Sequence, residues 1–208
     1  MPNGSLSLPA RLHLLAWDAA RPEGAGPLVR SGALTELAQR GLLVDEDGIA
    51  TPVDLDSRTG DPVLDGLLEL VRESLPHRWR TWVTLRARTT LAAVREQLVA
   101  EGYLGAERKR VLGVFPSVEY VLERGAAVDA LRKEARSLLD GAVPVGEVAE
   151  RDAALAALAV AGGLLEPAGD RERVARLTER SGPGLHNVVR EVCAAVTAAT
   201  AVTASTGG

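Results

Sequence analysis

Apolar side chains recur at intervals of three and four residues along most of this 208-residue chain, and that spacing restricts its possible folds more than any other feature. Leu, Val and Ala must form the core, because 46% of the residues are hydrophobic but only 3% are aromatic. Ala- and Leu-rich segments of this kind favour helices. The sequence therefore predicts a mainly α-helical fold, with helices near residues 6–17, 28–40, 62–74, 90–101, 126–139, 147–161, 170–180 and 185–204.

Short motifs indicate where these helices begin and how they are connected. The sequence TGDP at residues 59–62 is typical of a helix start. Asp61 can accept hydrogen bonds from free backbone N–H groups, and Pro62 suits the first helical turn. The linkers at residues 141–146 and 181–184 are too short to separate domains. We therefore expect one compact domain over residues 1–208.

Two further segments predict β-hairpins. The first joins residues 42–44 to residues 49–53 through DEDG, a sequence typical of tight turns. The second covers residues 111–122, with a turn expected at Pro116 and Ser117. Its apolar residues alternate poorly with polar ones, so both faces of this ribbon are apolar along much of its length. Such a ribbon either is sandwiched in the core or protrudes into apolar surroundings.

Basic residues beside the second hairpin help to decide between these two positions. Composition alone favours the core, but Arg108, Lys109 and Arg110 stand directly before the apolar segment. Basic residues next to exposed apolar ones combine attraction to anionic lipid headgroups with burial at the membrane interface. Each basic residue near an anionic surface contributes about 1 kcal/mol, so these three would act together with inserted apolar side chains. We therefore expect this hairpin to protrude.

The charge and cysteine content restrict the class of protein. With 24 basic and 28 acidic residues the net charge is -4, which argues against a protein that coats nucleic acid. The segment at residues 76–110 differs, with eight basic against three acidic residues. Cys193 is the only cysteine, which favours a reducing compartment. No segment reads as a signal peptide or a membrane span, so we expect a cytoplasmic protein whose membrane association is peripheral.

Residues that could perform catalysis are scattered. His13, His77 and His186 stand far apart, and the phosphate-loop, dinucleotide and nucleophile-elbow motifs are absent from the sequence. Cys193 lies in an apolar segment, which favours a buried, inert thiol. Asp54, Asp56 and Asp61 are better interpreted as a polar loop before a helix than as a carboxylate cluster. We expect no catalytic residue, metal site or cofactor.

The basic segment indicates a binding function instead. Arg and Trp alternate through Arg78, Trp79, Arg80 and Trp82, which suits either a phosphate-rich interface or simple packing of long side chains. Both interpretations stay open from the sequence alone. Arg86 and Arg88 follow, just before the helix predicted near residue 90. Together with the basic residues before the second hairpin, these arginines indicate an anionic partner.

Five segments, in order, resemble one family. Residues 6–17 are similar to its opening helix, and LTELAQRG at residues 34–41 is similar to its ELALRG helix end. The resemblance continues in TGDPVLD at residues 59–65, in residues 95–104, and in RVLGVFPSVEYVL at residues 110–122. These segments resemble the Golgi phosphoprotein 3 family, including its bacterial relatives, over most of residues 6–139.

The resemblance implies a helical domain that binds phosphatidylinositol 4-phosphate and inserts its hairpin into the cytosolic leaflet. Arg30 and Arg88 match two headgroup-binding arginines of the family, and we expect Arg86 to assist them. The third arginine position falls on Leu91, and the shortened loop at residues 21–26 has no aromatic residue at the family's Trp position. The residues expected to enter the membrane are Leu112, Val114, Phe115, Val118 and Tyr120.

Two other functions remain open on the sequence. One is a helical protein–protein scaffold that uses the hairpin to form homo-oligomers. The other is a winged-helix DNA-binding regulator, with residues 94–101 as recognition helix and residues 111–122 as wing. Glu96 and Glu101 on that helix, and an apolar wing, argue against nucleic acid as the partner. Family members also retain membrane enzymes, so such a cargo protein is a third expected partner, beside the anionic membrane and a second copy.

Overall fold

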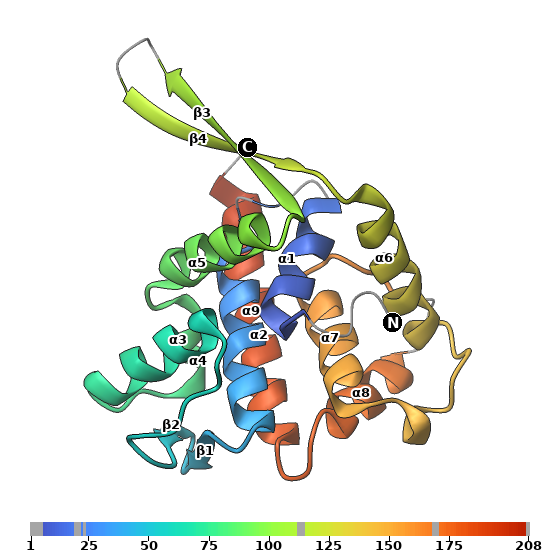
Figure 1. The fold of residues 1–208 in the computed structure, drawn as a ribbon. Coiled ribbons are helices and arrows are strands. Elements are labelled where there is room, and N and C mark those ends of the chain that lie inside the picture. Colours follow the sequence, from blue (N-terminus) through green and yellow to red (C-terminus); the bar gives the residue numbers. More distant parts are fainter. Residues whose placement is uncertain (1–5, 19–21, 23, 112–114, 168–170, 207–208) are drawn as a thin grey trace.

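The computed structural model describes residues 6–18, 22, 24–111, 115–167 and 171–206, apart from the side chains of residues 18, 108–111, 115–117 and 203–206. The described chain is mainly helical, as predicted (Figure 1). Its α-helices are α1 Leu8–Asp18, α2 Gly26–Gln39, α3 Pro62–Glu73, α4 Trp79–Thr84, α5 Ala87–Ala100, α6 Gly125–Leu139, α7 Glu150–Ala161, α8 Arg171–Arg180 and α9 His186–Thr206. The strands are β1 Leu43–Glu46, β2 Ile49–Pro52, β3 Leu104–Val111 and β4 Phe115–Leu122, and a 3-10 helix covers Val145–Glu147.

Helix α2 lies at the centre of the domain. Its residues from Gly26 to Ala38 are buried with the exception of Pro27, so the helix has almost no solvent face. Helices α1, α4, α5, α7 and α9 all pack against it. In Figure 1 these helices surround the blue α2, with α9 running behind it. A helix enclosed in this way must satisfy its polar side chains within the protein.

Helix α3 begins where the sequence predicts. The side chain of Asp61 accepts hydrogen bonds from the backbone N–H groups of Val63 at 2.8 Å and Leu64 at 3.1 Å. Pro62 occupies the first helical turn, which lacks an internal hydrogen-bond acceptor for its N–H groups in any helix. The predicted cap is therefore confirmed.

Helix α4 was not predicted from the sequence, because its six residues carry too little periodicity. Its formation follows from the burial of Trp79 and Trp82, which are both completely enclosed in the core. The indole Nε1 of Trp79 donates to Asp45 Oδ1 at 2.8 Å, so one polar atom of this buried pair is satisfied. For these two tryptophans the packing interpretation is therefore confirmed.

The two hairpins differ in how well the sequence predicted them. Strands β1 and β2 pair as expected, but the turn consists of Asp47 and Gly48 alone, because Asp45 and Glu46 of the predicted DEDG turn lie within β1. Strands β3 and β4 form a longer ribbon than residues 111–122, pairing Leu104 with Leu122 at one end and Val111 with Phe115 at the other. The turn predicted at Pro116 and Ser117 is wrong, because both residues lie within β4. A two-stranded ribbon buries neither face, so charged residues in β3 gave no strand-like pattern.

The second hairpin protrudes from the helical body, as the sequence analysis predicts. In Figure 1 the ribbon projects beyond every helix from the end of the molecule where α5 and α6 meet it. Its root is anchored, because Tyr103 and Leu104 are buried in the core. Further along the ribbon Val118 is 48% exposed. The hairpin is thus an arm held at one end.

Helix α1 crosses α2 closely at Gly32, and this contact yields a first prediction. A Cβ atom at Gly32 would lie 2.6 Å from Leu12 Cδ1 and 3.1 Å from the backbone of Pro9. We expect Gly32→Ala to lower the free energy of unfolding by about 1–3 kcal/mol, because the helices must separate. Gly66→Ala in α3, where a Cβ atom meets no atom within 4 Å, should instead raise it by about 0.5–1 kcal/mol. Urea unfolding of both variants tests the pair, and a stabilising Gly32→Ala would contradict the packing.

Candidate functional site

Two helix N-termini meet at one point of the structure. Gly26 at the start of α2 faces Ala87 at the start of α5, with 3.6 Å between an ideal Cβ at Gly26 and the Ala87 backbone. The residue before α5 is Arg86, which has a left-handed backbone with φ of 52° and forms no side-chain cap. The first N–H groups of a helix point outward unbonded, and together they attract anions. Arg86 and Arg88 are both exposed beside them.

Beneath this surface lies a buried cation, Arg30. Its side chain is 1% exposed, and Nη2 donates to the backbone carbonyl of Arg86 at 2.6 Å. Nε and Nη1 find no hydrogen-bond partner among the described residues. Burial lowers the pKa of Arg30 to about 10 from its usual 12.5. Because a buried charge without a counter-charge is costly, this position favours a nearby anion.

A hollow of about 430 Å³ continues from Arg88 along α5 towards the hairpin. Its lining is part apolar, from Leu91 and Ala92, and part cationic, from Arg88 and Arg95. Tyr120 of β4 closes it, with its ring centroid 5.1 Å from the guanidinium carbon of Arg95. Sequence reasoning missed Arg95 as a site residue. Its position between Val94 and Leu98 on the apolar face of the predicted helix was the available signal.

The structure brings some of the predicted site residues together and separates others. Arg86 and Arg88 are both exposed on the surface, whereas Arg30 lies in the interior and, among the described residues, hydrogen-bonds to the backbone carbonyl of Arg86. Tyr120 was predicted to enter the membrane, but it lies half-buried at the root of the hairpin against α5. Val118 is exposed, as an inserting residue must be.

Other predicted hairpin residues fall outside the described part of the molecule. This holds for Leu112 and Val114 entirely. Phe115 is described only as a backbone position in β4. The backbone of β3 carries the three basic residues, whose side chains are likewise outside the description: Arg108, Lys109 and Arg110.

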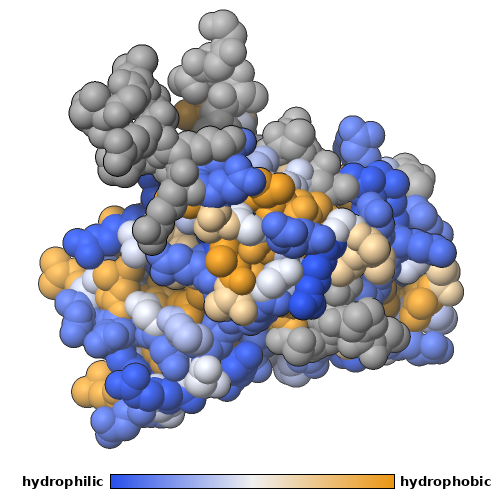
Figure 2. All heavy atoms as spheres, turned by 45° about the horizontal axis from the view of Figure 1, so that its top comes forward, coloured by the Kyte–Doolittle hydropathy of each residue, from blue (hydrophilic) through white to orange (hydrophobic). Residues whose placement is uncertain are grey.

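The surface at the hairpin end of the molecule is mixed in character. Figure 2 turns this end forward and shows hydrophobic patches directly beside hydrophilic ones. The exposed side chains of the arm itself include Val118 and Val121. A mixed apolar and charged face suits the boundary between headgroups and acyl chains better than it suits bulk water.

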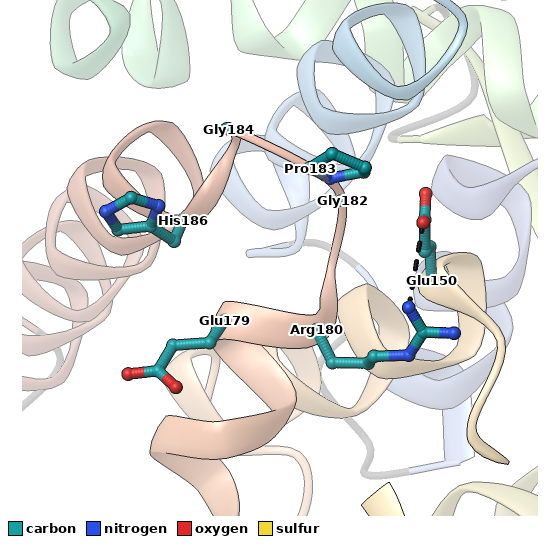
Figure 3. A pocket seen from close by; sticks show the side chains of 7 residues that line it. All are labelled: Glu150, Glu179, Arg180, Gly182, Pro183, Gly184 and His186. Carbon is teal, nitrogen blue, oxygen red and sulfur yellow. Dashed lines mark ion pairs between the residues drawn. The ribbon is translucent and has the colours of Figure 1, made fainter. Parts of the chain in front are cut away.

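Another hollow opens near the ends of α7, α8 and α9, and we considered it as a rival site. Figure 3 shows Glu179 and His186 on one side of it, with Glu150 and Arg180 on the other. Arg180 Nη1 lies 3.8 Å from Glu150 Oε1, so these two charges offset one another. Among the described residues, nowhere do three His, Cys, Asp or Glu side chains gather as metal ligands would. The hollow therefore indicates no particular ligand.

Behind the α5 surface, His13 is buried in α1 without a polar partner. The side chain is 0% exposed, and neither ring nitrogen has a hydrogen-bond partner among the described residues. Its ring meets Trp17 edge-on, with 5.9 Å between the centroids. Burial, and next the positive charge of Arg95, lower the pKa of His13 to about 3 from 6.5. The imidazole is thus neutral in the folded protein at physiological pH.

This shifted pKa gives a second prediction, on stability against pH. Between pH 6.5 and 3 the unfolded chain binds a proton at His13 and the folded chain does not. The contribution of this group to the free energy of unfolding is therefore complete above pH 6.5 and decreases as the pH falls below it. The single group contributes a slope of up to about 1.4 kcal/mol per pH unit. Urea unfolding at pH 4.5 to 7.5 gives the free energy of unfolding at each pH. Its slope against pH should be shallower for His13→Gln than for the wild type. Equal slopes would contradict the prediction.

Comparison with known proteins identifies the family of the chain. The family model described as Golgi phosphoprotein 3 (GPP34) matches residues 8–200, a longer stretch than the resemblance seen in the sequence motifs. No curated protein matches the chain. In the part of the chain that the structure describes, no helix combines the length and apolar character needed to cross a bilayer.

Proposed function

The chain belongs to the Golgi phosphoprotein 3 family, and we propose that it is a peripheral membrane protein that binds an anionic phospholipid headgroup, phosphatidylinositol 4-phosphate or a similar one. The headgroup lies at the start of α5, and the β3–β4 arm enters the cytosolic leaflet. No catalytic step is part of this function. The site needs only to hold an anion and to anchor an apolar arm.

The observation that carries the proposal is the buried charge of Arg30 beneath two helix N-termini, because its Nε and Nη1 have no hydrogen-bond partner among the described residues. A phosphate above Arg86 and Arg88 meets the positive end of the α5 helix dipole, two exposed guanidinium groups and the field of a buried third one. Arg30 supports the site from below by holding the Arg86 carbonyl, rather than by touching the lipid. The left-handed backbone of Arg86 is a strained conformation that such a contact helps to hold.

The arm supplies the second half of the attachment. Exposed Val118 and Val121 support insertion, and the sequence places Leu112, Val114 and Phe115 towards its far end. Three basic residues in β3 precede them and add about 1 kcal/mol each near an anionic surface. One phosphate contact or a few apolar side chains alone hold a protein weakly, so the two halves are needed together.

The winged-helix alternative fits the structure poorly. The face of α5 that carries Val94 and Leu98 is buried in the core, which leaves Glu96 and Glu101 on the solvent side. Carboxylates at the exposed positions repel the phosphates of a nucleic acid. The scaffold alternative predicts instead that the arm joins copies of this chain, and the experiment below separates it from lipid binding.

Co-sedimentation with vesicles tests the proposal. We expect Arg88→Gln to weaken binding to vesicles containing phosphatidylinositol 4-phosphate about fivefold, which corresponds to about 1 kcal/mol. Val118→Asp should weaken it more, because a charge replaces an inserted apolar group. Matched controls are Arg58→Gln and Val53→Asp, which lie between β2 and α3 at the opposite end of the molecule (Figure 1). Both control side chains are exposed, and Val53 is 53% exposed.

The outcomes separate the alternatives. Equal binding to neutral and anionic vesicles, or equal losses in the test and control variants, would rule out the proposed site. Size-exclusion chromatography with light scattering on the wild type and Val118→Asp provides the second measurement. If Val118→Asp converts an oligomer to a monomer and leaves lipid binding intact, the scaffold function replaces lipid insertion.

A further inference from the structure

One side chain, that of Arg95, connects the three segments that build the proposed site. It belongs to α5, which follows Arg86 and carries Arg88 in its first turn. Its Nη2 donates to the carbonyl of Pro22, in the segment that leads into α2, at 3.0 Å. Its guanidinium carbon lies 5.1 Å from the ring centroid of Tyr120 on the arm. At 9% exposure, Arg95 is one of the few charged residues enclosed by the domain.

The arm depends on its root for its direction. Eight residues in each strand give a length of about 26 Å, and α5 is its main packing partner among the helices. A tilt of about 10° at the root therefore displaces the far end by about 5 Å. That distance is comparable with the depth to which interfacial groups enter a membrane, about 5–10 Å. Contacts at the root thus decide whether the arm and the headgroup site reach the membrane together.

Two cation–π contacts hold this root. Arg124, just after β4, lies 4.8 Å from the ring centroid of Tyr103, just before β3. That pair joins the segments that flank the two strands at the root of the ribbon. The pair of Arg95 and Tyr120 instead joins the ribbon to α5. Only the second pair also faces the hollow that begins at Arg88.

An anion at Arg88 therefore acts on the contact that directs the arm. Arg88 and Arg95 stand seven residues apart on one face of α5, about 10 Å along the helix axis, and line the same hollow. A bound phosphoester offsets the repulsion between the two guanidinium groups. Arg95 is then held more firmly between the phosphate on one side and the Tyr120 ring on the other.

We infer that Arg95 is the positioning residue that couples the lipid headgroup at Arg88 to the direction of the β3–β4 arm. The inference rests on the proposed function, since it needs an anion at that site. The coupling is reciprocal: a headgroup that aligns the arm is itself bound more tightly when the arm is aligned. A membrane that offers both headgroup and acyl interface is therefore preferred over either one alone.

Distance measurements between two spin labels test this coupling without a bilayer. Labels are placed at Val118 on the arm and at exposed Glu69 on α3, in a Cys193→Ser background. The probe is dioctanoyl phosphatidylinositol 4-phosphate below its micelle concentration. We expect the probe to narrow the distance distribution in the wild type. In Arg95→Met the probe should leave the distance distribution unchanged. The affinity for the probe should also fall about fivefold, which is the lower end of typical coupling between sites.

Matched variants separate positioning from a general loosening of the root. Arg124→Met removes the other cation–π pair and should keep the narrowing, because that pair does not face the hollow. Arg95→Lys keeps a cation above Tyr120, so in this variant the probe should narrow the distance distribution partially. If Arg95→Met does not fold, Tyr120→Leu breaks the same contact from the arm, and Tyr120→Phe keeps the ring. The probe should then fail to narrow the distance distribution in Tyr120→Leu and should still narrow it in Tyr120→Phe.

The results distinguish this inference from the proposed function. Narrowing that survives in Arg95→Met or Tyr120→Leu, or that is lost equally in Arg124→Met, overturns the role of Arg95. A wild type that binds the probe with no change in distances overturns the coupling and leaves the proposed function standing. A wild type that binds no probe, in solution or in vesicles, overturns both.

Discussion

The packing around α2 depends on the interactions of one buried carboxylate, that of Glu36. Buried within α2, it accepts a hydrogen bond from the backbone N–H of Leu8 at 2.6 Å and so caps α1. Arg40 reaches it at 2.6 Å, and Arg151 of α7 lies 3.7 Å away. One buried charge with this many partners fixes three helices relative to one another, and the loss of any partner would leave it uncompensated.

The other end of α2 holds a buried charge of opposite sign, Arg30, with fewer partners. Among the described residues, Arg30 hydrogen-bonds to one carbonyl, whereas Glu36 contacts two guanidinium groups and a backbone N–H. A core that compensates one buried charge fully and another incompletely is unlike ordinary packing, in which buried charges are paired. This asymmetry along a single helix is the basis of the proposed anion site at the Arg30 end.

How much could be predicted from the sequence depends on whether a feature is local. The Asp61 cap and the β1–β2 hairpin are set by neighbouring residues, and both were predicted correctly apart from the length of the turn. Helix α4 forms because two tryptophans enter a core built by distant segments, which no local pattern reveals. The same holds for the proposed site: the sequence context pointed to exposed Arg88, whereas the interior position of Arg30 and the contacts of Arg95 are set by tertiary structure. The binding roles of these residues stay predictions.

A net charge of -4 is compatible with the proposed docking on an anionic surface, because the longest acidic segment lies far from the proposed site. Residues 41–57 include five acidic and no basic side chains, and they surround β1 and β2. Figure 1 places these strands at the end opposite the arm. Salt screens charges beyond about 8 Å, so in the proposed docking mode the membrane meets the arginines of α5 and not the distant carboxylates. Arg72 pairs with Asp54 and Arg78 lies beside Ile49 at that end, which partly offsets its negative charge. The proposed orientation therefore depends on the arginines near the arm and not on repulsion at the opposite end.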